Sequence, residues 1–539
     1  MIPFVRISAM PEEPKVFVRT ASGLVRTISP WGALSLAFVM PGILNAIYLG
    51  MWGAGLYPDA YEPPAVLLVF ILLPVMAVFY LFSVAMPRSG GDYIYVSRSL
   101  SPVLGLVTSW TFVVVFWSWA GNVAMLSWLY GPVVDFVARG QMTGDQGLVN
   151  LGLLIANDKT ILFALSTLST IAMGVIAWAG TKAVTRTMYF VWVVSTVGLI
   201  AYCIPWLTMP SLDFFKSNML QMTGVDYGKL IETARGAGWP GQFTIMGTIY
   251  AGVVYIMLNT LGNQAVTTCA GEVKEVKRTT FLALFGSLVL MALYWFPQYY
   301  LVFEYAGREF TSASAFLDII GQNQFIVEPT WTYLVAFATK NPTLVAIQAW
   351  AFWLSDWAIG FGSLFFSTRA VFAWGFDRVF PSLANRVDKR GSPWGAVLIA
   401  TIGCEVWTFL NVYLPQYIKV VGYSITVWAI GWVLIGIAAI VFPYRKKNIF
   451  EKSPDVVRRK VAGIPTLVYT GVLTVAIGLF MVWATFVPSL SGYQAFWPLL
   501  TTVIICIIAP VIIFYAYYAY RTRVGKVRMD IQFKEIPPD

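Results

Sequence analysis

Histidine is absent from the 539 residues of this chain, and charged residues make up only 12% of it. A soluble globular protein carries about twice that charged fraction. Without histidine, imidazole catalysis, ordinary haem ligation and the commonest side-chain ligand of metals are excluded. Cysteine is also scarce. Four cysteines lie in or beside apolar segments and form neither a disulfide framework nor a Cys-x-x-Cys metal pattern: Cys203, Cys269, Cys404 and Cys506.

Apolar residues are what the chain has in excess: 58% are hydrophobic and 16% aromatic, and the mean hydropathy is +0.71. This composition predicts an all-α integral membrane protein. The net charge of +10 could indicate nucleic-acid binding, but it is better explained by basic residues on the cytoplasmic side of a membrane protein. Twelve segments are long enough to cross a roughly 30 Å hydrocarbon core. They lie near 27–51, 64–86, 102–134, 160–180, 185–208, 243–268, 279–303, 342–373, 395–413, 417–443, 466–487 and 495–520.

Lysine and arginine predict the orientation of these spans. With the N-terminus inside, most of the 36 basic residues fall on the cytoplasmic side, whereas the acidic residues show no such bias. The positive-inside rule then places both termini in the cytoplasm of a multi-pass cell-membrane protein. Long external loops are expected near 135–159, 209–242 and 304–341. The last two would form either short helices over a vestibule or simple exposed loops.

Helix-breaking residues interrupt two of the twelve spans. Pro41 and Gly42 lie halfway along 27–51, where Pro41 lacks an amide hydrogen and Gly42 lowers helix stability. The span 243–268 has a polar, glycine-containing interruption at 259–263. In hydrocarbon, a freed backbone group is tolerated only where it faces protein or a wet cavity. Two broken helices in corresponding positions are typical of secondary transporters and indicate the substrate site.

The two breaks lie five spans apart, which predicts two inverted five-helix repeats around a site at mid-membrane. The last two spans are then peripheral additions to a ten-helix transport core. The expected parts are a cytoplasmic tail at 1–26, the core at 27–443 with repeats 27–208 and 243–443, a cytoplasmic loop at 444–465, two additional transmembrane helices at 466–520 and a cytoplasmic tail at 521–539.

Three motifs follow spans 2, 6 and 8 in that order. They read Pro87-Arg88-Ser89-Gly90-Gly91-Asp92-Tyr93-Ile94-Tyr95, then Ala270-Gly271-Glu272-Val273-Lys274-Glu275-Val276-Lys277-Arg278, then Ser367-Thr368-Arg369 with Asp377-Arg378-Val379-Phe380-Pro381 and Gly391-Ser392-Pro393. Over roughly 27–443 the chain thereby resembles the amino acid–polyamine–organocation (APC) superfamily of amino acid permeases. It departs from that family's Asn-Pro at 275–276, from its Asp-Gly at 377–378 and from its glycine-rich first break at 40–43.

The resemblance implies a leucine-transporter-like fold, in which the substrate rests against exposed backbone of spans 1 and 6. Half-helix N-termini favour an anion there, and unwound carbonyls favour an ammonium or a cation. Asn122 in span 3 either reaches this site or forms a helix-to-helix hydrogen bond. The other residues expected to bind the substrate are Met40, Pro41, Gly42, Ile43, Asn259, Leu261, Gly262 and Asn263.

Asp356 lies near the middle of the span 342–373, where a carboxylate is costly and normally faces a cavity or a partner. It shares one helical face with Gly360, Ser363 and Ser367. It is therefore either an ion-coupling group or a structural residue hydrogen-bonded to a Trp or Ser. As a coupling group it would carry a proton, or stay ionised beside sodium or a cationic amine. Related folds hold sodium between span 8 hydroxyls and span 1 carbonyls, which implies Ser363 and the carbonyls near Val39 here.

These features predict a secondary active transporter that moves an amino acid or related amine by alternating access, coupled to a proton or sodium gradient or by exchange. Enzyme activity is not expected, because the two deep carboxylates, Asp356 and Glu405, form no nucleophile–base constellation. No cofactor, no nucleic acid and no metal beyond sodium is expected. The expected partners are a small-molecule substrate, H⁺ or Na⁺ and the lipid bilayer. Two alternatives remain: a leucine-transporter-like carrier of another small metabolite, and a non-transporting membrane receptor or assembly subunit. The oligomeric state stays open.

Overall fold

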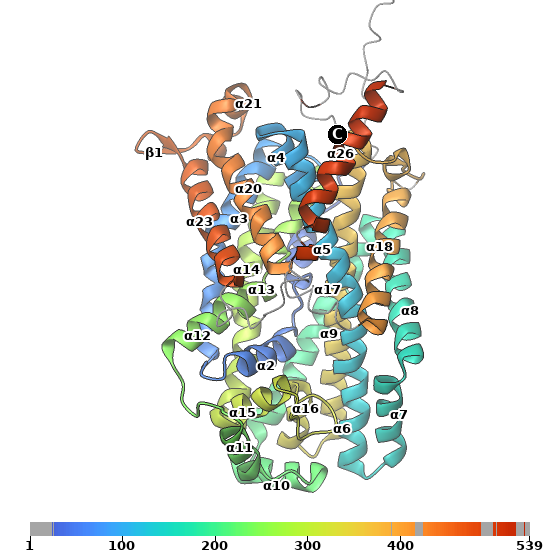
Figure 1. The fold of residues 1–539 in the computed structure, drawn as a ribbon, viewed down its shortest axis with the longest axis vertical. Coiled ribbons are helices and arrows are strands. Elements are labelled where there is room, and N and C mark those ends of the chain that lie inside the picture. Colours follow the sequence, from blue (N-terminus) through green and yellow to red (C-terminus); the bar gives the residue numbers. More distant parts are fainter. Residues whose placement is uncertain are drawn as a thin grey trace, which may run out of the picture.

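The structure is a computed structural model that describes residues 24, 26–389, 391–414, 424–486, 500–502, 504–523 and 533. It is an elongated bundle of helices, most of which run along the long axis (Figure 1). Within the described residues, ten helices are long and apolar enough to cross a membrane. They are Pro63–Ala85, Pro102–Thr143, Lys159–Trp178, Thr181–Thr208, Val276–Ala306, Pro342–Phe376, Trp394–Tyr413, Thr426–Arg445, Thr466–Ala484 and Leu500–Arg523. The all-α membrane fold is confirmed, while the count of twelve spans and the inverted repeat stay predictions.

Several of these ten spans consist of consecutive elements. The first joins the 3₁₀ helix η1 (Pro63–Leu72) to α3 (Leu73–Ala85), and the second runs from α5 (Pro102–Trp128) through the π-helix η2 (Leu129–Val133) into α6 (Val134–Thr143). The remaining elements are α8 (Lys159–Trp178), α9 (Thr181–Thr208), α14 (Val276–Leu301) with η6 (Val302–Ala306), α17 (Pro342–Phe376), α18 (Trp394–Tyr413), α20 (Ser424–Arg445), α23 (Thr466–Phe486) and η10 (Ile504–Ile508) with α26 (Ala509–Arg523).

The predicted spans 1 and 6 are the two in which no single helix reaches the required length. Span 1 consists of α1 (Pro30–Val39) and α2 (Ala46–Leu56), with a non-helical stretch between them. Span 6 consists of α12 (Ile245–Ala251), the π-helix η3 (Gly252–Ile256), the single turn α13 (Met257–Asn259) and the 3₁₀ helix η4 (Asn263–Thr268). Both interruptions therefore occur where the sequence places helix-breaking residues.

Three spans begin with the same local signal, a capping side chain followed by proline. Ser29 Oγ accepts from the Gly32 amide at 3.1 Å, and Ser101 Oγ accepts from the Leu104 amide at 3.3 Å. Asn341 caps α17 in the same way. The proline that follows each cap has no amide hydrogen to leave unpaired, so the sequence fixes where α1, α5 and α17 start.

The segment 135–159 is helical, which corrects the expectation of a loop there. The helix α6 ends at Gly144, whose φ of 72° terminates it, and the Asp145 side chain caps the next helix, α7 (Gln146–Asn157). The hydropathy of the sequence did not predict α6 and α7, because hydropathy indicates which segments lie in lipid and not which segments form a helix. The other two expected loops contain the short helices α10 (Leu212–Thr223), α11 (Tyr227–Gly236), α15 (Arg308–Ile319) and α16 (Trp331–Val335), followed by η7 (Ala336–Ala338).

These short helices gather at one end of the molecule together with α6 and α7 (Figure 1). The opposite end carries the loop elements between spans: α4 (Asp92–Ser99), η5 (Ala270–Glu272), η8 (Ser382–Asn385), α21 (Lys447–Lys452), α22 (Asp455–Arg458) and the hairpin of β1 (Lys460–Val461) and β2 (Ile464–Pro465).

The helix α17 is central to the packing, because it contacts α5, α9, α18 and α8. The helix α1 packs on α14, and α20 packs on α23. This arrangement surrounds the two broken spans with long helices. Residues 1–23, the span start at 417–423, the region 487–499 and most of the tail after residue 523 lie outside the described residues, and the proposed domain boundaries stay predictions.

Candidate functional site

The first helix break is built by Pro41 and Gly42. Gly42 has a φ of 88°, which residues with side chains rarely adopt. A Cβ at this position would also lie 2.7 Å from Ile359 Cδ1, so there is no room for a side chain. The Gly42 amide donates to the Val39 carbonyl at 2.9 Å, and Pro41 has no amide hydrogen. The break is thus a tight turn between α1 and α2.

Two side chains of α14 pair with carbonyls that this turn releases. Trp295 Nε1 donates to the Gly42 carbonyl at 3.3 Å, and Gln298 Nε2 donates to the Ile43 carbonyl at 2.9 Å. All of these groups are buried. Because no water is available inside the bilayer, such side-chain donors let the backbone leave the helical path.

The second break turns at Gly262, which has a φ of 109°. Its amide donates to Gln264 Oε1 at 3.2 Å. A Cβ at Gly262 would lie 2.1 Å from Met40 Sδ, so the thioether of the first break rests directly on the glycine of the second. Asn45 Nδ2 also donates to Asn259 Oδ1 at 2.7 Å. The two interruptions, more than 200 residues apart in the chain, therefore meet at one point.

Several buried polar atoms without a hydrogen-bond partner in the described residues lie on the elements that meet here. A buried polar group without a partner is costly, so a group of them marks a place where a bound molecule can supply the missing partners. On the two breaks and on α5, α14 and α17 these atoms include Asn45 Oδ1, Asn122 Nδ2, Asn259 Nδ2, Asn263 Oδ1, Gln264 Nε2, Gln298 Oε1, Ser363 Oγ and both carboxyl oxygens of Asp356.

Asp356 is fully buried, with 0% exposure, and neither of its oxygens has a hydrogen-bond partner among the residues that the structure describes. Its neighbour Ser355 accepts from the Leu44 amide at 3.0 Å, which holds this turn of α17 against the first break. The Tyr48 ring on α2 packs on Phe352, about one helical turn before Asp356, with ring centroids 6.1 Å apart. The hydrogen bond to a Trp or Ser that a purely structural role would use is not present among the described residues.

Ser363 also lies beside the first break. Its Oγ is buried and has no partner in the described part of the chain, and a Cβ on the adjacent Gly362 would lie 2.5 Å from Met40 Cγ. The Val39 carbonyl accepts the Gly42 amide and is part of the same turn. The structure thus brings the hydroxyl and the carbonyl of the expected sodium site to neighbouring elements.

The other predicted residues differ in their surroundings. Leu261 is buried at the second break, and Asn263 Nδ2 donates to Ser287 Oγ of α14 at 3.2 Å. Asn122 is buried on α5 and makes no side-chain hydrogen bond to another helix in the described part of the chain. Glu405 is half-buried at the interface of α8 and α18, where Thr167 donates to it at 2.5 Å. The structure does not bring Glu405 to the breaks.

The three sequence motifs meet at the end of the bundle opposite the short helices. Gly90 of the first motif donates its amide to the Thr268 carbonyl at 2.8 Å, just before the second motif. Arg369 of the third motif pairs with Glu272 of the second at 2.9 Å, and Thr181 donates to the same carboxylate. These contacts join spans 2, 5, 6 and 8 at one buried junction.

A second buried ion pair closes this end of the molecule. Arg98 Nη1 and Nη2 contact Asp377 Oδ2 and Oδ1 at 2.5 and 3.0 Å, so the pair is bidentate. Both side chains are 1% exposed. Because both buried arginines are neutralised by carboxylates, neither supplies a free positive charge to the site.

A family model described as amino acid permease matches residues 28–510. The chain belongs to the amino acid permease family. It is accordingly a multi-pass membrane transporter for a small molecule rather than an enzyme, and the resemblance carried by the three motifs is confirmed. A search of curated proteins finds no match.

At the opposite end of this family member, acidic and aromatic residues connect the short helices to spans 1 and 3. The Tyr130 hydroxyl on η2 donates to Glu328 at 2.6 Å, and its ring packs on Tyr48 of α2 with centroids 5.3 Å apart. Burial, together with the charge of Glu328, raises the pKa of Asp318 to about 7. This end therefore contains a group that changes charge near neutral pH.

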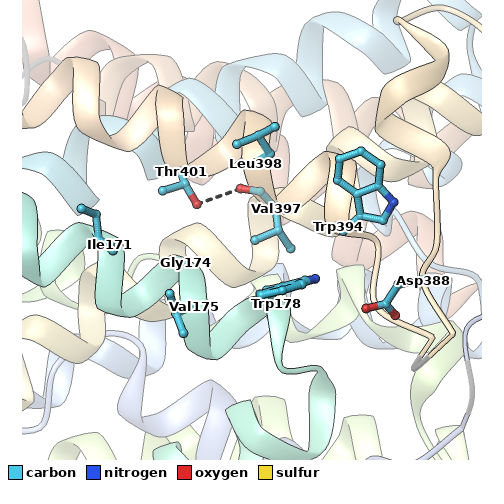
Figure 2. Close-up of a pocket in the computed structure, with 9 residues that line it drawn as sticks. All are labelled: Ile171, Gly174, Val175, Trp178, Asp388, Trp394, Val397, Leu398 and Thr401. Carbon is cyan, nitrogen blue, oxygen red and sulfur yellow. Dashed lines mark hydrogen bonds between the residues drawn. The ribbon is translucent and has the colours of Figure 1, made fainter.

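A separate hollow of about 490 Å³ lies between α8 and α18 (Figure 2). It exists partly because of Gly174, where a Cβ would lie 2.6 Å from Thr401 Oγ1. Large apolar side chains of its lining are exposed, so in a bilayer the hollow faces lipid. None of the predicted substrate-binding residues lines it. The lining residues are Ile171, Gly174, Val175, Trp178, Asp388, Trp394, Val397, Leu398 and Thr401.

Sequence reasoning missed several residues that shape the site. Asn45, Gln264, Trp295, Gln298 and Ser355 all bond to one of the breaks. Polar residues within apolar spans were an available signal for the Asn, Gln and Ser residues. No sequence signal distinguished Trp295 from the other 21 tryptophans of the chain.

Proposed function

We propose that this family member is a secondary active transporter that moves an amino acid or a related amine across the cell membrane by alternating access. The contact between the two helix breaks is the observation that supports this most directly. It brings two interrupted spans to one buried point, and several buried polar atoms on these spans have no partner in the described residues. A solute bound there would supply those partners, and movement of the half-helices would expose it to either side.

Coupling is proposed to involve Asp356, Ser363 and the Val39 carbonyl. Asp356 is fully buried and has no partner within the described ranges, and Ser363 and Val39 belong to elements in contact at the first break. A proton on Asp356 or a sodium ion beside Ser363 would each couple substrate movement to an ion gradient. Exchange of one solute for another is the third coupling mode that we propose, beside proton and sodium coupling.

The proposed architecture has twelve spans in two inverted repeats of five with two added helices, and both termini in the cytoplasm. The motif junction and the basic loops then lie on the cytoplasmic side, and α10, α11, α15 and α16 lie outside. The breaks, situated between these two ends, would be the part of the molecule that both sides reach in turn.

Counterflow of labelled solute in proteoliposomes tests the proposal. A wedge at the contact between the breaks, Gly262→Val, should abolish counterflow, because its Cβ would overlap Met40 Sδ. Gly236→Val is the matched control, since no atom lies within 4 Å of a Cβ at that position. It should exchange solute like the unmodified protein.

Two results would count against the proposal. Equal counterflow by the Gly262→Val and Gly236→Val proteins would separate transport from the breaks. Saturable binding of an amino acid or amine without any counterflow would favour a non-transporting receptor instead.

A further inference from the structure

Glu62 carries a buried carboxyl group that the site at the breaks does not use. It lies in the loop after α2, immediately before the span that begins at Pro63, and is 0% exposed. Neither of its carboxyl oxygens has a hydrogen-bond partner among the described residues. Because a buried carboxylate without a partner is costly, burial raises the pKa of Glu62 well above its ordinary value.

One half of each broken span packs around this carboxyl group. A Cβ on Gly53 of α2 would overlap Glu62 Oε1 and would lie 3.6 Å from Tyr255 Cβ of η3, so the group fits because residue 53 has no side chain. The element η3 contacts both α2 and η1, which Glu62 precedes, and α2 also contacts the short helices α15 and α16. Separation of α2, η1 and η3 would expose the carboxyl group to water.

No charge on the elements packed here offsets ionisation of Glu62. The described elements α2, η1, α12, η3, α13 and α16 contain no lysine, arginine, aspartate or glutamate. The titratable groups that pack on this face of α2 are phenols, which ionise near about pH 10: Tyr57, Tyr255 and Tyr299. The charge of Glu62 near neutral pH therefore depends on whether water reaches it.

Charged residues on the surrounding segments have other neighbours. Lys277 and Arg278 lie at the start of α14, next to the motif junction. The others are in the ion pairs Glu304–Arg308 and Arg235–Glu309, in the hydrogen bond from Thr244 to Asp59, and in the carboxyl pair of Asp318 and Glu328. None of these groups forms a hydrogen bond with Glu62 in the described part of the chain.

We infer that Glu62 is a proton-binding site that links opening of the short-helix end, the end with α10, α11, α15 and α16, to the proton concentration on that side. This inference rests on the proposed transport function and adds a regulatory step to it. While α2, η1 and η3 are packed together, the carboxyl group keeps its proton. When they separate, the O–H bond breaks, the proton passes to water and the carboxylate is hydrated. Acid on that side therefore holds this end closed.

The direction of the pH effect follows from the two environments of the carboxyl group. A hydrated glutamate titrates near about 4.3, whereas burial raises the pKa of Glu62 in the packed state. The packed state thus binds the proton more tightly than the open state does. The proton's contribution to packing is fully present below about pH 4 and is lost as the pH rises through the raised pKa. Within that window, opening becomes up to about tenfold more favourable per pH unit, because one proton is released.

Infrared spectroscopy of the reconstituted full-length protein tests whether Glu62 holds a proton. At pH 7 an exposed glutamate is ionised, whereas a protonated carboxyl group has a C=O stretching band distinct from that of a carboxylate. The spectrum of the unmodified protein minus that of Glu62→Gln should contain one such band. Glu232→Gln is the control, because Glu232 is exposed on α11, and its difference spectrum should contain none. Absence of the band for Glu62→Gln would overturn the inference.

Hydrogen exchange of α2 tests the link to opening. After correction for intrinsic rates, exchange in α2 of the unmodified protein should be at least tenfold faster at pH 7 than at pH 5. Glu62→Gln has no proton to release, so its exchange in α2 should not change over this range. Asp318→Asn, which alters a carboxyl group on the adjacent helix α15, should keep the pH dependence of α2. Melting curves would show that each variant is folded.

The outcomes separate this inference from the broader function. If folded Glu62→Gln protein keeps the pH dependence of exchange in α2, the inference is wrong, although counterflow would still show a transporter. If the pH dependence is lost in Asp318→Asn as well, the titration does not belong to Glu62 alone and the inference is also wrong. Absence of counterflow for every solute tested would remove the transport proposal, and with it the regulatory role, while the infrared band would still show whether Glu62 binds a proton.

Discussion

Two acidic residues near the middle of predicted spans, Asp356 and Glu405, have very different surroundings. Glu405 is half-buried and receives a hydrogen bond from Thr167, whereas Asp356 is fully buried and has no partner among the described residues. Their positions in the sequence did not distinguish them, because depth within a span says nothing about which side of a helix has a donor. The difference in partners is what makes Asp356 the stronger candidate for function.

Replacement of Asp356 by asparagine is expected to abolish gradient-driven uptake while the protein still folds. Asparagine has nearly the same volume, so packing is kept while the charge is lost. Uptake into proteoliposomes with an imposed ion gradient measures the effect, and the melting temperature checks the fold. Uptake at the unmodified rate would show that the residue is structural and that ion coupling lies elsewhere.

Removal of Arg369 should destabilise the protein strongly, because it leaves Glu272 as an unpaired buried charge. Both side chains are almost fully buried, and breaking such a pair costs roughly 3–5 kcal/mol. Arg369→Met would be compared with Arg235→Met, which breaks an exposed pair with Glu309 worth at most about 1 kcal/mol. Thermal unfolding in detergent should show a much larger loss for Arg369→Met, and equal losses would contradict this account.

At the scale of elements, local signals in the sequence predicted the fold well where one residue type decides the backbone. Pro41 with Gly42, and Gly262, mark the two breaks that the sequence analysis predicted, while the capped prolines at three helix starts were recognised only in the structure. What joins the elements was not predictable, since a contact such as Asn45 with Asn259 depends on how two distant segments pack. The helices α6 and α7 were missed although Gly144 and Asp145 are typical helix-ending and helix-starting residues.

The helix α15 should become less stable as the pH rises through neutrality. Burial and Glu328 raise the pKa of Asp318 to about 7, while an unfolded aspartate titrates near about 4. The folded state thus binds the Asp318 proton more tightly than the unfolded state does. The contribution of this proton to the free energy of unfolding is fully present below about pH 4 and is lost above about pH 7. Hydrogen exchange of α15 should accordingly be faster at pH 8 than at pH 5.5, after correction for intrinsic rates.

Two variants check this pH effect. Asp318→Asn has no proton to lose, so the pH dependence of exchange in α15 should disappear. Asp213→Asn, on the surface of α10, should keep it. A pH dependence that persists in Asp318→Asn would assign the titration to another group.

At the scale of the whole molecule, the two ends differ in kind. One end is closed by two buried ion pairs within the family motifs. The other is covered by short helices connected to spans 1 and 3 through Tyr130 and Glu328 (Figure 1). The sequence predicted which loops share a side. It did not predict that buried ion pairs close the end with the family motifs, or that short helices cover the other end.

The predicted orientation can be tested by labelling introduced cysteines. Lys229→Cys on α11 should react with a membrane-impermeant maleimide in intact cells, and Lys452→Cys on α21 should react only after permeabilisation. Both positions are exposed. Among the native cysteines only Cys203 is partly exposed, so the background should be small. The reverse labelling pattern would show that the termini are external.

The thioether of Met40 packs against Gly262 where the two breaks meet, so its oxidation can be used to detect separation of the breaks. Its sulfur is sealed from solvent, with 0% exposure of the residue, and peroxide can oxidise it only when the breaks separate and water enters. The sulfoxide oxygen would then occupy space that the closed contact does not have. The rate of Met40 oxidation, measured by mass spectrometry, would therefore report how often the two breaks separate. A ligand that holds the breaks together would lower this oxidation rate.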